Sequence, residues 1–125
     1  MRVFQLLVIV QSIYTLITAV WPIIHIESFM EVTGGKTDVW LVKTVGALLI
    51  PVSACLMAYL FINTDRRPAM ILGGLSSIAF ICVDFYYSLT DVICDIYMAD
   101  GYLQIIFLCG WVYIALKRYS MPVKQ

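Results

Sequence analysis

The chain has 125 residues, of which 62% are hydrophobic and 13% are charged, and its mean hydropathy is +0.94. Soluble domains carry about 45–50% apolar and about 25% charged residues, and a chain of this size has too small an interior to hide so many apolar side chains from water. This excludes a soluble enzyme, a disordered chain and a nucleic-acid binder, and the equal numbers of basic and acidic residues leave no net charge to attract a polyanionic partner. We therefore predict an integral membrane protein whose first partner is the lipid bilayer.

A membrane-spanning helix needs about 20 mostly apolar residues, and four stretches of the chain meet this requirement. They cover about residues 3–26, 39–62, 68–90 and 95–117. The first stretch is too long for a signal peptide and has no small-residue cleavage site, so we expect it to be retained. Pro68 is expected to open the third helix, since proline is well tolerated in a first turn. The connections are short, which predicts an all-α membrane protein with one domain over residues 1–125, an antiparallel bundle of four transmembrane helices.

The basic residues of the connections are unevenly divided between the two sides of this bundle. One side carries Arg2, Arg66, Arg67, Lys117, Arg118 and Lys124, and the other has Lys36 and Lys43. Because short cytoplasmic connections are enriched in Lys and Arg, both termini are predicted to be cytoplasmic. We expect a protein of the inner (plasma) membrane.

Polar residues of the first predicted span fall on a single helical face. Gln11, Thr15, Thr18, Pro22 and His25 follow one another at steps of four, three, four and three residues. One interpretation is a helix–helix seam with hydrogen bonds across the bundle. The other is the wall of a polar pocket open to the outer side, and the spacing alone does not choose between them.

Ionisable residues in the predicted spans indicate a polar layer in the outer half of the bundle. Counting residues along each helix places His25, Lys43, Asp84 and Asp100 at similar depth, with Gln104 one turn beyond Asp100. A charge at mid-membrane costs about 2.5–3.5 kcal/mol even on the lenient insertion scale, which makes such residues functional candidates. The alternative is a structural ion pair between Lys43 and Asp84 or Asp100.

Other polar and aromatic residues on the outer side favour no cofactor or metal. Five acidic residues form an outer rim that we interpret as solvated: Glu27, Glu31, Asp38, Asp91 and Asp95. Their spacing with His25 matches no zinc pattern, and the four cysteines contain no C-x-x-C pair. Trp40 belongs to an aromatic group at the membrane interface that could also line a pocket.

The stretch SFMEVTGGKTDVWLVKTVG at residues 28–46 resembles a segment of small, uncharacterised bacterial four-span membrane proteins of the DoxX-like type. The resemblance implies a four-helix fold and a membrane location, and it carries over no catalytic residue. Within this stretch Gly34 and Gly35 indicate a turn, and Thr37 or Asp38 is the expected N-cap of the second span. The connection is expected to fold back over the polar layer as a lid.

Two classes of function remain open. The first is a non-enzymatic bundle, either an accessory subunit packed against other membrane subunits or a protein that binds a lipophilic small molecule. Its candidate ligand-binding residues are Gln11, Thr15, His25, Trp40, Lys43, Asp84, Asp100 and Gln104. The second is a small lipid or sterol-type isomerase, by analogy of fold alone. In that enzyme Asp84 or Asp100 would exchange a proton at carbon, with Lys43 holding the other carboxylate ionised and His25 nearby.

Overall fold

A computed structural model describes residues 2–62 and 64–119, and this part of the chain is helical without strands. The helices are α1 (Arg2–Ile24), α2 (Ile26–Thr33), α3 (Val39–Ala58), α4 (Arg67–Leu89) and α5 (Ile96–Tyr119). All except the eight-residue α2 are long and apolar enough to cross a membrane. The predicted all-α fold with four membrane-spanning helices is confirmed. Lys124, which entered the predicted orientation, lies outside the described residues.

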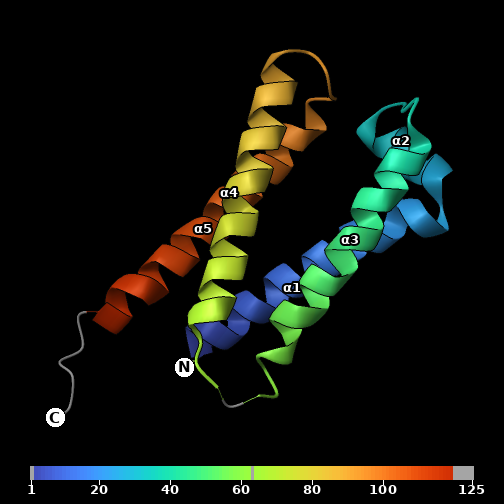
Figure 1. The fold of residues 1–125 in the computed structure, drawn as a ribbon. Coiled ribbons are helices and arrows are strands. Elements are labelled where there is room, and N and C mark those ends of the chain that lie inside the picture. Colours follow the sequence, from blue (N-terminus) through green and yellow to red (C-terminus); the bar gives the residue numbers. More distant parts are fainter. Residues whose placement is uncertain (1, 63, 120–125) are drawn as a thin grey trace, which may run out of the picture.

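The four long helices pair as two antiparallel hairpins, α1 with α3 and α4 with α5 (Figure 1). Each pair packs along its length, whereas α3 and α4 contact each other at few points. The hairpins meet near the start of α1 and separate toward the end that carries α2. The fold therefore has a closed end and an open end.

The buried apolar core lies at the closed end. Its members come from the start of α1, the end of α3, the start of α4 and the end of α5: Phe4, Val8, Leu56, Ala69, Trp111 and Ile114. The rings of Phe4 and Trp111 pack edge to face with their centroids 6.0 Å apart. Away from this core the outward faces of the long helices are apolar and exposed, as expected for surfaces that contact lipid; Leu6 and Leu48 are 63% and 65% exposed.

Two glycines allow the helices to approach closely. A side chain at Gly46 would collide with the carbonyl oxygen of Ala19 on α1, and one at Gly73 would collide with the indole ring of Trp111 on α5. Association of helices in lipid depends on such packing, because lipid tails are as apolar as the side chains themselves. Each hairpin thus has one glycine at which its two helices approach closely: Gly46 between α3 and α1, and Gly73 between α4 and α5.

The helix boundaries differ from the predicted ones at two places. The first span ends at Ile24, and residues 26–33 form α2 where the sequence predicted the end of a span and a loop. His25 separates the two helices as the N-cap of α2, since its Nδ1 accepts a hydrogen bond from the Ser28 amide at 3.2 Å. The second span ends at Ala58 rather than near residue 62. Asp38 occupies the predicted N-cap position of α3, but its side chain forms no capping hydrogen bond.

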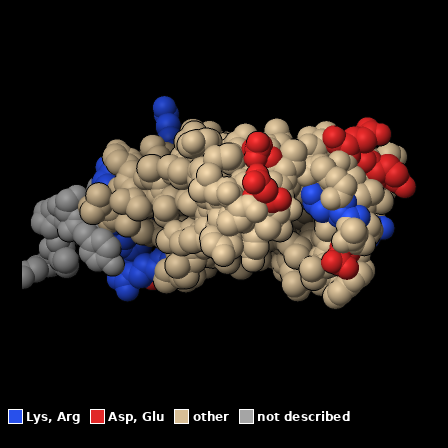
Figure 2. All heavy atoms as spheres, turned by 90° about the horizontal axis from the view of Figure 1, so that it is seen from above, with Lys and Arg blue, Asp and Glu red and all other residues tan. Residues whose placement is uncertain are grey.

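Charged residues are separated along the molecule (Figure 2), with most basic side chains toward one end and most acidic ones toward the other. The helix termini and connections place Arg2, Arg66, Arg67, Lys117 and Arg118 at the basic end, and Glu27, Glu31, Asp38, Asp91 and Asp95 at the acidic end. Lys36 and Lys43 lie toward the acidic end. Asp65 lies at the basic end, where its carboxylate accepts a bond from Arg118 at 3.2 Å and so joins the α3–α4 connection to α5.

Adjacent glycines in α4 provide a test of the close approach to α5. Gly73→Ala should lower the free energy of unfolding by about 1–3 kcal/mol, because the buried Trp111 ring cannot move aside. Gly74→Ala is the matched control: its new methyl group would meet the nearest atom only at 4.0 Å, so stability should stay the same or rise by up to about 1 kcal/mol through helix propensity. Unfolding in detergent, followed by tryptophan fluorescence, measures both. Equal effects of the two variants would contradict the proposed contact.

Candidate functional site

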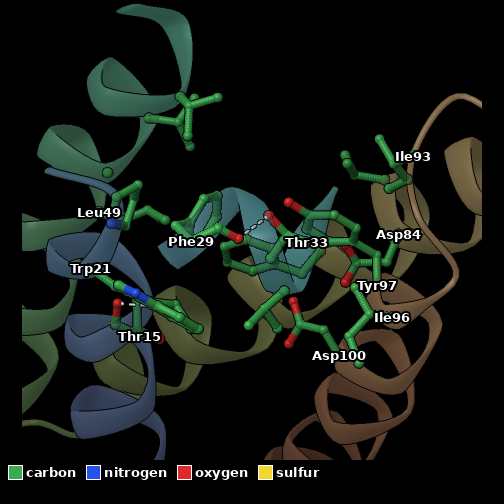
Figure 3. Close-up of a pocket in the computed structure, with 18 of the residues that line it drawn as sticks. Thr15, Trp21, Phe29, Thr33, Leu49, Asp84, Ile93, Ile96, Tyr97 and Asp100 are labelled. Atoms are coloured by element: carbon green, nitrogen blue, oxygen red, sulfur yellow. Dashed lines mark hydrogen bonds between the residues drawn. The ribbon is translucent and has the colours of Figure 1, made fainter. Parts of the chain in front are cut away.

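A cavity of about 670 Å³ lies between the two hairpins in the half of the bundle nearer the acidic end (Figure 3). Residues of all five helices line it, and its size falls in the range of small-molecule sites. Figure 3 shows Asp84, Tyr97 and Asp100 on one side of the cavity and Trp21 and Leu49 on the other. The cavity thus has a polar wall with both carboxyl groups, supplied mainly by α4 and α5, and an apolar wall, supplied mainly by α3. Helix α1 contributes polar side chains such as Thr15 as well as apolar ones such as Pro22.

Asp100 is held in the polar wall by donors from two helices. The hydroxyl of Tyr14 on α1 donates to Asp100 Oδ1 at 2.6 Å, and Gln104 Nε2, one turn along α5, donates to the same oxygen at 3.4 Å. An O–H···O distance of this length is typical of a bond to an ionised carboxylate. The Tyr14–Asp100 bond also links the first hairpin to the second at the floor of the cavity.

Asp84 and Gln104 each have a buried acceptor oxygen with no hydrogen-bond donor in the described chain. Both residues are only 2% exposed, and neither Asp84 Oδ2 nor Gln104 Oε1 has a hydrogen-bond partner. Both line the cavity. Leaving a buried acceptor unpaired costs about 1–3 kcal/mol, and such groups are uncommon in native proteins. Two of them in one cavity indicate a place where a donor from outside the chain fits.

The roof of the cavity is α2, which is fastened to α1. The indole Nε1 of Trp21 donates to Ser28 Oγ at 2.9 Å, and the Trp21 and Phe29 rings pack edge to face at 5.5 Å. Phe29, Val32 and Thr33 present the inner face of α2 to the cavity. A covering segment was predicted for this connection, but it is the helix over 26–33 that covers the polar layer.

The exposure of apolar lining residues on α3 and α4 indicates an opening between these two helices, which contact each other at few points. Leu41 and Val45 on α3 and Val83 on α4 line the cavity and are each about half exposed, at 47%, 48% and 49%. The opening is therefore framed by apolar side chains at membrane depth. A molecule dissolved in the bilayer would reach the polar wall through it without crossing water.

The predicted candidate residues divide into two groups. Thr15, Asp84, Asp100 and Gln104 line the cavity and lie together as expected. The others do not line it: Gln11, His25, Trp40 and Lys43. The spacing of polar residues on α1 left a helix–helix seam and a pocket wall open, and α1 contains both. Gln11 forms a seam, whereas Thr15, Thr18 and Pro22 line the cavity.

Gln11 forms the seam through hydrogen bonds to the other hairpin. Its Nε2 donates to Gly73 O and to Ser77 Oγ, both at 3.1 Å, and its Oε1 accepts from Trp111 Nε1 at 2.6 Å. A second buried bond, from Ser53 Oγ to the Ser12 carbonyl at 2.6 Å, fastens α3 to α1. All polar atoms of the buried Gln11 side chain are satisfied, so its role is structural.

The expectation that Lys43 pairs with Asp84 or Asp100 is wrong. Lys43 is exposed, and no ion pair joins it to a carboxylate within residues 2–62 and 64–119. The reason is helix rotation: Val42, Gly46 and Leu49 form the face of α3 that lines the cavity, and Lys43 follows Val42 by one residue, about 100° around the helix.

His25 and Trp40 are also outside the cavity. The His25 side chain is exposed and caps α2, with Glu27 Oε2 3.9 Å from its Nδ1, and Trp40 is 69% exposed on the outer surface of α3. Among the described residues, no group of three or more His, Cys, Asp and Glu side chains is arranged to hold a metal ion.

Sequence reasoning did not include Tyr14 or Tyr97 as site residues. Tyr14 precedes Thr15 on α1, and its partner Asp100 is 86 residues away, so spacing within one helix contains no signal for the pair. Tyr97 lines the cavity. It also lies under Lys36, whose Nζ is 5.2 Å from the ring centroid and donates to the Thr33 carbonyl at 2.8 Å. Burial lowers the pKa of Lys36.

The Gln11 network can be tested separately from the cavity. Gln11→Leu leaves the buried Trp111 N–H without an acceptor, so the free energy of unfolding should fall by about 1–3 kcal/mol. Combining it with Trp111→Phe removes both polar partners, and the double variant should then lose clearly less stability than the sum of the two single losses. Thermal unfolding of the four proteins in detergent gives the coupling. Strictly additive losses would show that the two side chains do not depend on each other.

Comparisons of the chain with protein-family models, with curated proteins and with solved structures gave no match. The resemblance of residues 28–46 to DoxX-like proteins therefore stays a prediction from that segment. The function has to be argued from the cavity itself.

Proposed function

We propose that this small membrane protein binds a lipophilic molecule in the cavity between its two hairpins. The observation that carries the proposal is the pair of buried acceptors, Asp84 Oδ2 and Gln104 Oε1, that lack partners in a cavity with an otherwise largely apolar lining. A few convergent polar groups in an apolar pocket are the usual design of a small-molecule site. The polar group of the ligand would lie at Asp84, Asp100 and Gln104, and its hydrocarbon part would face α1 and α3.

The lateral opening supports a ligand taken from the bilayer. Leu41, Val45 and Val83 frame the opening with apolar side chains, so a hydrophobic molecule keeps its apolar part out of water as it enters. Asp84 lies five residues before the end of α4, which places it about 7 Å below that end. The polar wall is therefore close enough to the membrane surface for the head of an amphiphile.

Catalysis by an isomerase has less support than binding. Two of the four residues assigned to that chemistry, Lys43 and His25, lie outside the cavity. The remaining carboxyl groups, Asp84 and Asp100, are sufficient for recognition. An accessory-subunit role stays a prediction, since the exposed apolar faces of the long helices suit lipid and a neighbouring subunit equally well.

We also propose an orientation in a bacterial inner membrane with the basic end and both termini in the cytoplasm. The support is the charge separation, with Arg66 and Arg67 in the short α3–α4 connection and acidic residues at the other end. In this orientation the cavity opens into the outer leaflet.

A cavity-filling substitution tests the binding site. Val45→Trp should place an indole ring in the opening and abolish binding, whereas Leu48→Trp, on the same helix but facing lipid, should leave binding unchanged. Native mass spectrometry of the protein purified gently from its own membrane measures the retained small molecule. Equal retention by both variants, or no retained molecule in any form of the protein, would contradict the proposed function.

Cysteine labelling tests the orientation. Cys94 is exposed at the acidic end, so a membrane-impermeant maleimide added to intact cells should label it. In a Cys94→Ser background, Thr64→Cys in the α3–α4 connection should react only after the membrane is permeabilised. The reverse pattern would place the termini outside.

A further inference from the structure

The unsatisfied polar groups of the cavity are acceptors. Asp84 Oδ2 and Gln104 Oε1 have no partner, and Asp100 accepts through Oδ1 from Tyr14 and Gln104. An ionised carboxylate only accepts hydrogen bonds, and the amide oxygen of glutamine does the same. An occupant that supplies donors therefore satisfies these groups.

Most donors of the cavity lining are already used inside the protein. Their partners are other side chains or carbonyl groups, as for Tyr14 with Asp100, Trp21 with Ser28, Thr18 with the Tyr14 carbonyl and Thr33 with the Phe29 carbonyl. The hydroxyls of Thr15 and Tyr97 can donate or accept. The lining thus offers a ligand more acceptors than donors.

The cavity also has acidic groups without a basic counterpart. Asp84 and Asp100 are the ionisable carboxyl groups of the lining, and no Lys, Arg or His of the described chain lines it. Lys36, a cation at this end of the molecule, is held by the carbonyls of Thr33 and Gly34 above the Tyr97 ring. Ionisable groups at membrane depth are normally paired, so a positive charge from the occupant would complete this site.

On the basis of the proposed binding function, we infer that the occupant is a protonated lipophilic primary amine. An ammonium group has three N–H donors, and Asp84, Asp100 and Gln104 offer three acceptor side chains around one cavity. The aromatic ring of Tyr97 lies on the same side of the cavity as the two carboxyl groups (Figure 3) and can add a cation–π contact. An anionic lipophile would instead place a further negative charge beside two carboxyl groups.

A series of dodecyl compounds that share one chain and differ only in the head group tests this inference. The compounds are dodecylamine, dodecyltrimethylammonium, dodecanol and dodecanoate, each at the same low mole fraction of an uncharged detergent. Native mass spectrometry measures the bound fraction during titration. Dodecylamine should bind about tenfold or more tightly than dodecanol, since a hydrogen bond to a charged group contributes about 1.5–3 kcal/mol. Dodecyltrimethylammonium, which has the charge but no N–H, should be weaker than the amine, and dodecanoate should not bind.

A pair of acidic variants assigns the preference to the cavity. Asp84→Asn should weaken dodecylamine about tenfold and leave dodecanol nearly unchanged, because it removes charge and retains shape. Asp95→Asn removes the same charge from an exposed position at the acidic end, so the affinity for the amine should stay the same. Equal losses in the two variants would mean that a general surface attraction, and not the cavity, selects the amine.

The outcomes separate this inference from the proposed function. If dodecanol or dodecyltrimethylammonium binds as tightly as dodecylamine, a lipophile site remains but the amine preference is overturned. If none of the four compounds binds, or if all bind equally to the Val45→Trp variant, the binding function falls as well. If Asp84→Asn does not fold, the binding of the four dodecyl compounds to the unmodified protein still decides whether the site prefers an amine.

Discussion

The hydrogen bonds and close contacts near the closed end hold the two hairpins together, and the rest of the structure depends on them. In lipid there is little hydrophobic gain when one apolar helix contacts another, so polar bonds and small residues decide where helices meet. Gln11 supplies three such bonds to the second hairpin, and Gly73 lets the Trp111 ring lie against α4. Because these contacts lie toward the basic end, α3 and α4 are free to separate toward the other end. The cavity is the consequence of that one-sided junction.

The sequence predicted well how deep each polar residue lies in the membrane. It predicted poorly which way each side chain faces around its helix axis. Composition and span length were sufficient for the four-helix fold, and residue counting placed Asp84 and Asp100 in one layer, where the cavity lies. Lys43 was placed at the right depth and on the wrong face. Depth follows from 1.5 Å per residue, whereas rotation depends on which face packs against the neighbour. In α3 that face is set by Gly46 against the Ala19 carbonyl, a contact between distant parts of the chain.

The sequence predicted a covering segment but not its helical form, for a related reason. Eight residues are too few for a helix to be stable alone, and nothing in the local pattern between two spans requires one. Trp21 makes the segment helical in its context by donating to Ser28, while His25 caps the first turn. These contacts need the preceding span as a platform. A short helix such as α2, which is stabilised by contacts with a neighbouring helix, therefore cannot be predicted from its own residues.

The two buried glutamines of the bundle show why the unpaired acceptors belong to a site rather than to imperfect packing. Gln11 and Gln104 are equally buried, each 2% exposed. All polar atoms of the Gln11 side chain are bonded, whereas Gln104 leaves its oxygen free beside the free oxygen of the equally buried Asp84. The side chain of Gln11 is thus fully hydrogen-bonded where the two hairpins join, whereas that of Gln104 is only partly bonded where the hairpins separate around the cavity. Buried polar groups without partners are costly, and here the unpaired ones lie in the lining of a cavity of about 670 Å³, which is large enough for a molecule that could satisfy them.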